Sequence, residues 1–134
     1  MSEYHKCSIS LTDTKCLVDA LVEMGYQPKI CEEAENLYGY QGDKRVQKAH
    51  VILPRSQVGN ASNDIGFEKV GKDYIMHISQ YDESVKSLDT NKLKQLYAKH
   101  KINKFIKKNS GKYRIKNQQV DKNGSIKIRI NRIS

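Results

Sequence analysis

The C-terminal end of the chain carries the pattern that most restricts its fold, because it specifies a β-hairpin. From residue 126 to residue 131, isoleucine alternates with charged or polar residues. A period of two places the two sets of side chains on opposite faces of a strand. The preceding Asn123-Gly124 is typical of a two-residue hairpin turn. The sequence therefore predicts antiparallel strands at residues 113–120 and 125–132, with one face packed and the other exposed to water.

Two segments have the period of an amphipathic helix. The first follows cap candidates at residues 12–14 and ends before Gly25, a typical residue after a helix C-terminus. The second has Asp89 or Thr90 as its cap candidate and Gly111 as its end. We expect each helix to bury one face against the rest of the fold. The apolar stripes are Leu17, Val18, Leu21 and Val22 in the first helix, and Leu93, Leu96, Tyr97 and His100, extended by Ile102, Phe105 and Ile106, in the second.

The remaining strands are predicted from short runs of alternating or continuous apolar residues. These runs lie at residues 4–11, 26–31, 49–53, 64–69 and 74–78. Residues 70–73 would form the turn of a hairpin between the last two. Residues 32–48 have no clear period and are expected to be irregular, residues 57–63 are a loop by composition, and residues 81–89 are a polar connection.

The order of these elements predicts an α+β fold. Strand, helix and paired strands come first, and further strands, a helix and a hairpin follow. Such an order favours a single mainly antiparallel sheet with two helices packed on one face. The same order also matches two pseudo-duplicated β-α-β-β units. The other face of the sheet would then be partly open for a partner.

Length and composition exclude several classes of protein. A chain of 134 residues suits a single domain, residues 1–134, with one hydrophobic core. Its apolar runs reach only about five residues, too few to cross a bilayer, so no membrane partner is expected. No apolar segment follows the first six residues, so no secretory signal is expected. The three cysteines lack close spacing and predict free thiols in a reducing compartment, which favours a cytoplasmic location.

Charge is distributed unevenly along the chain. From Lys92 onward there are fourteen Lys or Arg residues and one acid, Asp121, a net charge of +13. The first 91 residues hold ten basic and fourteen acidic residues, a net charge of −4. Such asymmetry favours an acidic partner, most often nucleic acid. The same stretch is rich in Lys, Asn and Ile, so the coding bias of an AT-rich genome is an alternative explanation.

The binding surface predicted from this charge lies at the end of the second helix and on the strand after it. Lys104, Lys107 and Lys108 share one helix face. The last two also complement the negative end of the helix dipole, which is a purely structural reason for their presence. Outward-pointing residues of the next strand would extend the surface. The candidate residues for nucleic acid or an acidic protein are Lys104, Lys107, Lys108, Lys112, Arg114 and Lys116.

Four short motifs occur in an order that resembles one family. They are Gly39-Tyr40-Gln41-Gly42, Asp64-Ile65-Gly66-Phe67, Leu96-Tyr97-Ala98-Lys99-His100 and Asp121-Lys122-Asn123-Gly124-Ser125-Ile126. Together they are similar to the hypothetical plastid reading frame thirty-five family, a domain of unknown function also found in cyanobacteria and phages. Gln41 replaces the Arg of that family's Gly-Tyr-Arg-Gly pattern, which weakens the case for an anion site at this turn.

The resemblance implies a fold and a length, and it supplies no activity. It adds the plastid stroma and the cytoplasm of an infected host to the possible locations. The motif positions whose role is unknown are Tyr40, Gly42, Asp64, Gly66, Tyr97 and His100.

No catalytic, cofactor or metal site is predicted. His5 and Cys7 are the only close pair of metal-ligand residues, whereas a zinc site needs three or four converging ligands. The glycine motif at residues 39–42 is neither a P-loop nor a dinucleotide fingerprint. It predicts a turn, and a ligand loop with stacking tyrosines is the alternative. Tyr97 and His100 are expected to pack against the sheet, each with its polar end hydrogen bonded.

Three functions are compatible with these features. We expect a small non-enzymatic binding module whose basic helix and hairpin engage nucleic acid or an acidic protein. The first alternative is a protein–protein adaptor or homo-oligomer that assembles through an open sheet face or edge. The second alternative is an enzyme with a site near Tyr40, Asp64 and His100, which requires these side chains to converge on one pocket.

Overall fold

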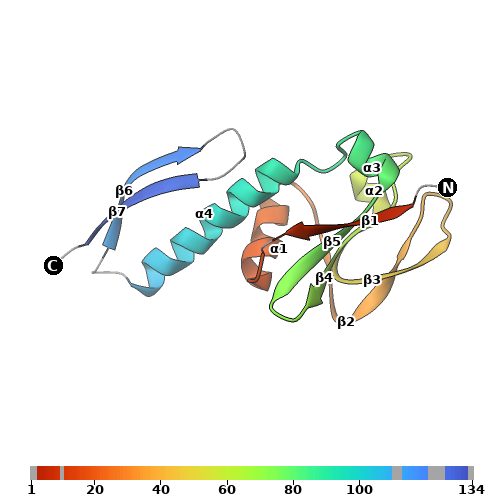
Figure 1. The fold of residues 1–134 in the computed structure, drawn as a ribbon, viewed down its shortest axis with the longest axis horizontal. Helices are drawn as coiled ribbons and strands as arrows, with labels where there is room; N and C mark the ends of the chain where they lie inside the picture. Colours follow the sequence, from red (N-terminus) through yellow and green to blue (C-terminus); the bar gives the residue numbers. More distant parts are fainter. Residues whose placement is uncertain (1–2, 10, 110–112, 121–125, 133–134) are drawn as a thin grey trace.

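Five strands form one open antiparallel sheet. The computed structural model describes residues 3–9, 11–109, 113–120 and 126–132. In spatial order β1-β5-β4-β3-β2, every neighbouring pair is antiparallel (Figure 1). The predicted α+β class with an antiparallel sheet is therefore confirmed. The strands are β1 (Tyr4–Ile9), β2 (Lys29–Tyr38), β3 (Lys44–Leu53), β4 (Ile65–Val70) and β5 (Asp73–Ser79).

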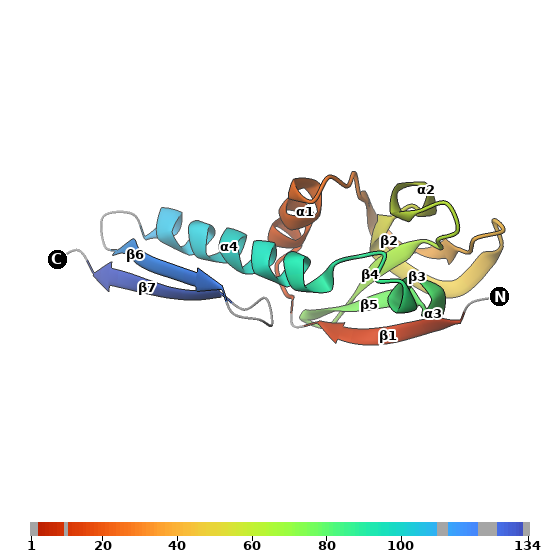
Figure 2. The ribbon, with the colours of Figure 1, turned by 90° about the horizontal axis from the view of Figure 1, so that it is seen from above.

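Two longer helices, α1 (Thr14–Glu23) and α4 (Thr90–Lys108), pack on one face of this sheet and against each other (Figure 2). Their caps agree with the prediction. The Asp13 side chain accepts a hydrogen bond from the Cys16 N–H, and the Asp89 side chain accepts one from the Lys92 N–H. Gly25 follows α1 with φ of 98°, a conformation that glycine adopts without strain. None of the described helices is long and apolar enough to cross a membrane.

The hydrophobic core lies between the helices and the sheet. Alternate residues of β3, β4 and β5 point toward the helices, as the period of two requires. They pack against part of each predicted stripe, namely Leu17, Val18 and Leu21 of α1 and Leu93, Leu96 and Tyr97 of α4. Val22 and Phe105 of the predicted stripes are exposed instead. Fully buried members include Leu17 and Leu21 of α1, Leu53 of β3, Ile65 and Phe67 of β4, and Leu93 of α4.

A second, smaller apolar cluster contains Cys31, Leu37, Ala49 and Ile52, with Tyr4 packed against it. Gly66 makes this packing possible. A Cβ atom at Gly66 would lie 2.5 Å from the Ala49 Cβ and 2.8 Å from the Leu37 Cδ2. The chain therefore favours glycine here because the Ala49 and Leu37 side chains already occupy the space that a side chain at residue 66 would need.

The prediction that residues 32–48 are irregular is wrong. The strand β2 continues to Tyr38 and β3 starts at Lys44, so most of this segment forms a hairpin. The reason is that β2 lies at the sheet edge, where most of its side chains are exposed and no apolar alternation is required. Its register with β3 also shifts between Ile30 and Glu35, which breaks any period of two.

Two short helices occupy segments expected to be irregular. The first, α2 (Arg55–Val58), overlaps the loop predicted from residue 57. The second, α3 (Gln80–Ser84), overlaps the polar connection predicted from residue 81. The α3 helix is capped by Ser79, whose side chain accepts a hydrogen bond from the Asp82 N–H. Both helices are too short to show a helical period in the sequence.

The predicted C-terminal hairpin is present as β6 (Tyr113–Val120) and β7 (Ile126–Arg132), which pair antiparallel. Among the described residues, these strands form a separate two-stranded sheet and do not join the other five. They lie beside the C-terminal half of α4 (Figures 1 and 2). The predicted Asn-Gly turn and the predicted helix end at Gly111 lie outside the described residues.

Candidate functional site

A pocket of about 380 Å³ lies where the β2–β3 turn meets the loop before β4 and the helix α3. Its lining combines two tyrosines with several polar side chains. The lining residues are Tyr40, Gln41, Asp43, Arg45, Ala61, Asn63 and Tyr81. Aromatic faces with a few polar groups are a usual composition for a small-molecule site.

The β2–β3 turn is shaped by its two glycines. The Gly39 N–H donates to the Asp43 carbonyl oxygen at 2.8 Å, and the Gly42 N–H donates to the Gly39 carbonyl oxygen at 2.9 Å. Gly42 has φ of 79°, which disfavours other residues. A Cβ atom at Gly39 would lie 2.5 Å from Asp43 Oδ1, so the Asp43 carboxylate rests directly against the Gly39 backbone.

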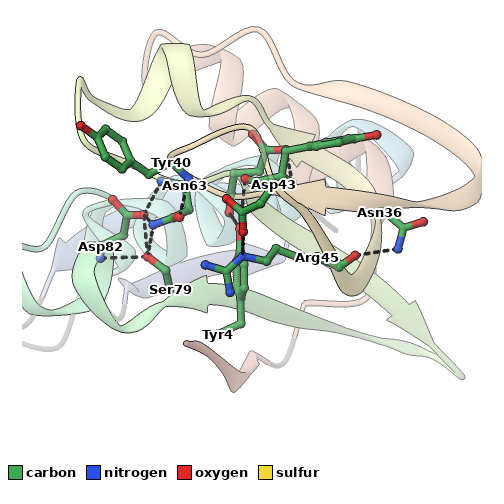
Figure 3. Close-up of polar contacts among 10 residues, drawn as sticks. Tyr4, Asn36, Tyr40, Asp43, Arg45, Asn63, Ser79 and Asp82 are labelled. Atoms are coloured by element: carbon green, nitrogen blue, oxygen red, sulfur yellow. Dashed lines mark hydrogen bonds and ion pairs between the residues drawn. The ribbon is translucent and has the colours of Figure 1, made fainter. Parts of the chain in front are cut away.

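Asp43 holds Arg45 at one wall of the pocket. The Arg45 Nε lies 2.7 Å from Asp43 Oδ2, and only 15% of the Arg45 side chain is exposed. The Arg45 guanidinium carbon also lies 5.3 Å from the centre of the Tyr4 ring, within the range of a cation–π contact (Figure 3). The Tyr4 hydroxyl donates to the Asp64 carbonyl oxygen at 2.7 Å. Burial raises the pKa of Tyr4, so this hydroxyl keeps its proton and remains a donor.

A buried polar network supports the opposite wall. Asn63 Oδ1 accepts a hydrogen bond from the Tyr40 N–H at 2.8 Å, and Asn63 Nδ2 donates to Ser79 Oγ at 2.9 Å (Figure 3). The Asp82 carboxylate accepts hydrogen bonds from the Asn63 N–H at 2.9 Å and from Ser79 Oγ at 2.7 Å. Ser87 Oγ donates to the other Asp82 oxygen at 2.7 Å.

The Asp82 carboxylate is fully buried and charged. Burial raises the pKa of Asp82, but the hydrogen bonds from the neighbouring hydroxyls and from the Asn63 N–H outweigh it, so its pKa is lowered overall. A buried charge is destabilising unless it is fully hydrogen bonded, and here the surrounding donors meet that need. The network therefore fixes the Asn63 loop, which in turn fixes the Tyr40 backbone.

Asp64 joins β2 to the segment after β3. Its two carboxylate oxygens accept hydrogen bonds from the Tyr38 N–H and the Arg55 N–H, each at 2.8 Å. The Asp64 N–H donates to the Tyr38 carbonyl oxygen at 2.9 Å. Asp64 is thus a structural acceptor whose lone pairs are used by the backbone around the pocket.

The structure brings together only part of the set of motif positions. Tyr40 and Gly42 lie in the β2–β3 turn. Asp64 lies next to this turn, because its carboxylate accepts a hydrogen bond from the Tyr38 N–H. Gly66 lies on β4 beneath Leu37.

The other two motif residues lie on α4 and contact α1 and the segment before it. The Tyr97 hydroxyl accepts hydrogen bonds from the backbone N–H groups of Thr12 and Asp13, at 3.0 and 2.9 Å. His100 Nε2 lies 3.3 Å from Glu23 Oε2. The set of Tyr40, Asp64 and His100 required by the enzyme hypothesis does not converge on one pocket.

Sequence reasoning missed Arg45, Asn63, Tyr81 and Asp82. Asn63 immediately precedes the Asp64 motif, and this was the one sequence feature that could have indicated a role for it. Asp82 lies in a segment whose polar composition predicted a solvated connection, yet it is fully buried. Only the fold shows that these residues meet.

The predicted basic surface is divided by the structure. Lys104 forms an ion pair with Asp13, and Lys101 lies 3.9 Å from the same carboxylate. Lys107 and Lys108 are exposed in the last turn of α4. Lys112 lies outside the described residues, and the side chains of Arg114 and Lys116 on β6 also lie outside them.

Within the described segments, no three His, Cys, Asp or Glu side chains are grouped so as to hold a metal ion. His5 lies 3.2 Å from Glu83, and the Cys7 side chain is outside the described part. Cys16 and Cys31 are free and buried. Burial raises the pKa of both thiols and so favours their protonated form.

The comparison with known families is decisive for membership. The sequence profile of a family described as "Protein of unknown function (DUF1257)" matches residues 20–129. The chain belongs to this family. The DUF1257 match extends over the β2–β3 turn, the Asp64 motif, α4 and most of the C-terminal hairpin. It confirms the expected membership in a family of unknown function. No curated protein and no solved structure matched the chain.

Proposed function

We propose that the protein is a non-enzymatic binding module that engages nucleic acid through the basic surface formed by α4 and the hairpin after it. The observation that supports this most directly is the composition of α4. Between Thr90 and Lys108 the helix has seven lysines and no acidic residue. Seven further Lys or Arg residues and one acid follow it. Phosphate groups bind to such surfaces through charge neutralisation and counterion release.

The contacts within the molecule indicate which lysines are available to a partner. Lys99, Lys101 and Lys104 face acidic residues of α1 or its cap, namely Glu23 and Asp13. Their charge is partly neutralised inside the molecule. Four other lysines of the helix are exposed: Lys92, Lys94, Lys107 and Lys108. The proposed phosphate contacts therefore lie at Lys107 and Lys108, which also lead into the basic hairpin sequence, rather than at Lys104.

The test is a salt titration of binding to single- and double-stranded DNA and RNA of random sequence, followed by fluorescence anisotropy. We expect the logarithm of the association constant to fall linearly with the logarithm of salt concentration. The double variant Lys107→Gln/Lys108→Gln should weaken binding and reduce the salt slope by up to about 2. The matched control is Lys92→Gln/Lys94→Gln, which removes the same charge at the other end of the same helix.

Two outcomes would overturn this proposal. One is the absence of binding at low salt, and the other is an equal loss in the two double variants. Binding to an acidic polypeptide such as poly-glutamate, without binding to nucleic acid, would instead identify an acidic protein as the partner.

Assembly through a sheet edge is the second candidate function. The edges of the five-stranded sheet are β1 and β2, and β2 exposes 59% of Ile30. The same strand carries a register shift and three glutamates at residues 32–35, both of which reduce edge-to-edge pairing. For this reason we rank assembly second. Light scattering tests it: a dimer mass that Ile30→Lys converts to a monomer mass would support assembly, and a monomer mass at all concentrations would exclude it.

We propose no catalytic role. Tyr40 and Asp64 belong to the pocket region, whereas His100 packs beside Glu23 on the helical side. The Asp64 carboxylate is also occupied by two backbone N–H groups. A general acid or base needs a free position facing a substrate, so this set does not meet the geometric condition.

A further inference from the structure

We propose that the pocket at the β2–β3 turn binds a nucleobase, with Tyr40 and Tyr81 as stacking surfaces and Gln41 and Asp43 contacting the polar edge of the ring. This goes beyond the proposed function, because it concerns a different part of the molecule and does not depend on the lysines of α4. The pocket volume of about 380 Å³ is in the range of small-ligand sites.

The exposure of the two tyrosines is the first argument. Tyr40 is 50% exposed and Tyr81 is 40% exposed, and both line the pocket. Exposure alone does not set these rings apart, because Tyr38 is 46% exposed as well; what sets them apart is that both line one pocket. Exposed aromatic rings in a concave site are typical of surfaces on which unstacked bases stack.

The buried network beneath the pocket is the second, independent argument. Asn63, Ser79 and Asp82 are all buried, and their hydrogen bonds terminate at the Tyr40 N–H. A hairpin turn needs no such support to close. The network instead fixes the position of a residue whose side chain is exposed, and preorganisation of this kind lowers the entropy cost of binding.

The polar lining determines which class of flat ligand fits. The Gln41 amide can donate and accept, and the Asp43 carboxylate can accept. A base edge presents adjacent donors and acceptors, so it can satisfy both groups. A phosphate group fits less well, because the Arg45 charge is already paired with Asp43 and the carboxylate would repel a second anion.

Free nucleosides provide the test, because they carry the base without phosphate. Guanosine, adenosine, cytidine and uridine are titrated into the ¹⁵N-labelled protein, and amide shifts are followed by NMR. We expect shifts at residues 40–45, 61–63 and 81, with purines binding more tightly because their larger rings stack more strongly. Glucose is titrated in the same way, to test whether the pocket recognises a sugar ring instead of a base.

Tyr38, at the end of β2, and Tyr40, in the turn after it, allow a matched pair of alanine variants. Tyr40→Ala should weaken nucleoside binding about tenfold or more, whereas Tyr40→Phe should retain it, since stacking needs only the ring. Tyr38→Ala is the control, because Tyr38 is also exposed but does not line the pocket. Neither alanine variant removes a hydrogen bond of the backbone, so both should fold, as thermal melting would verify.

The outcomes separate this inference from the proposed function. Nucleoside binding that Lys107→Gln/Lys108→Gln leaves unchanged supports a base pocket even if the basic surface binds no nucleic acid. The inference is overturned by the absence of pocket shifts at millimolar nucleoside, by glucose binding as tightly as the nucleosides, or by an equal loss in Tyr38→Ala and Tyr40→Ala.

Discussion

Lys104 on α4 forms an ion pair with Asp13, the residue that caps the N-terminus of α1. Asp13 also accepts a hydrogen bond from the Cys16 N–H at 3.0 Å. Burial opposes the charged form of Asp13, but the hydrogen bonds from Lys104 and Cys16 outweigh it and lower the pKa of Asp13 to about 2. One carboxylate therefore both begins α1 and attaches α4 to it.

This ion pair predicts an acid-sensitive part of the stability. Because the pKa of Asp13 is lower in the folded state than its ordinary value of 3.8, its stabilisation is complete above about pH 4 and is lost as the pH falls toward 2. Lys104→Met should lower the free energy of unfolding at pH 7 only modestly, because the lysine side chain is 58% exposed and solvent screens the ion pair. Urea denaturation at several pH values measures the difference, which should shrink between pH 4 and pH 2. The exposed Lys107→Met is the control, and an equal loss there would contradict the prediction.

The close packing around Gly66 predicts that Gly66→Ala causes a clash, and that a second substitution, Ala49→Gly, partly relieves it. Gly66→Ala places a methyl group 2.5 Å from the Ala49 Cβ. Overpacking of this kind should lower the free energy of unfolding by about 1–3 kcal/mol. Ala49→Gly in the same chain removes the closest contact and should restore part of the loss. Thermal and urea denaturation of both single variants and the double variant form a mutant cycle, and strictly additive losses would rule out the clash.

The hydrogen bonds of the Asp64 carboxylate predict that Asp64→Asn is destabilising, although it replaces only one carboxylate oxygen with an NH₂ group. In Asp64→Asn, whichever way the amide is placed, its NH₂ group faces the N–H of either Tyr38 or Arg55. One backbone donor is then left without an acceptor, which should lower the free energy of unfolding by about 1–3 kcal/mol. Asp19→Asn is the matched control, because Asp19 is exposed and pairs only with Lys15. Chemical denaturation should show a loss at residue 64 that is clearly larger than the loss at residue 19.

The position of the Tyr97 hydroxyl predicts that its removal lowers stability. Its hydroxyl accepts from two backbone N–H groups, those of Thr12 and Asp13, just before α1 begins. Tyr97→Phe keeps the ring in the core but leaves both donors without their acceptor, at a cost of about 1–3 kcal/mol. Amide hydrogen exchange at residues 12 and 13 should accelerate in this variant. Tyr38→Phe, on an exposed ring, should leave both stability and exchange unchanged.

The sequence predicted those parts of the fold that depend on local chemistry. Asp13 and Asp89 cap the helices as expected, because a short acceptor before an apolar stripe can bond the free N–H groups. The β4–β5 hairpin also formed at the predicted turn, where Val70 pairs with Asp73. Of the edge strand β2, only the start was predicted, within residues 26–31. Its continuation to Tyr38 was missed because Cys31 and Leu37 are its only buried residues, and two positions give no apolar period to detect.

The candidate site was less predictable because its parts meet only in three dimensions. Tyr40 and Asp64 were singled out through their motifs, and the structure places both near the pocket. Their support from Asp82 was not predicted, since hydrogen bonds between segments 19 residues apart leave no mark on either segment. The grouping of His100 with them was wrong, because a motif order along the chain does not determine which face of the fold each motif occupies.

The pairing of β1 with β5 has a consequence for how the chain acquires its structure. Tyr4 is aligned with Ser79, whereas β2 pairs with β3 and β4 with β5 through short turns. Hairpins closed by short loops form quickly, but a contact spanning so much of the chain must await the closure of a long loop. On the ribosome, β1 is synthesised before the other four strands of this sheet and yet has no partner until β5 has emerged. Of the five strands of this sheet, the earliest in the chain is thus among the last to be incorporated, and until then it is an unpaired segment available to a chaperone.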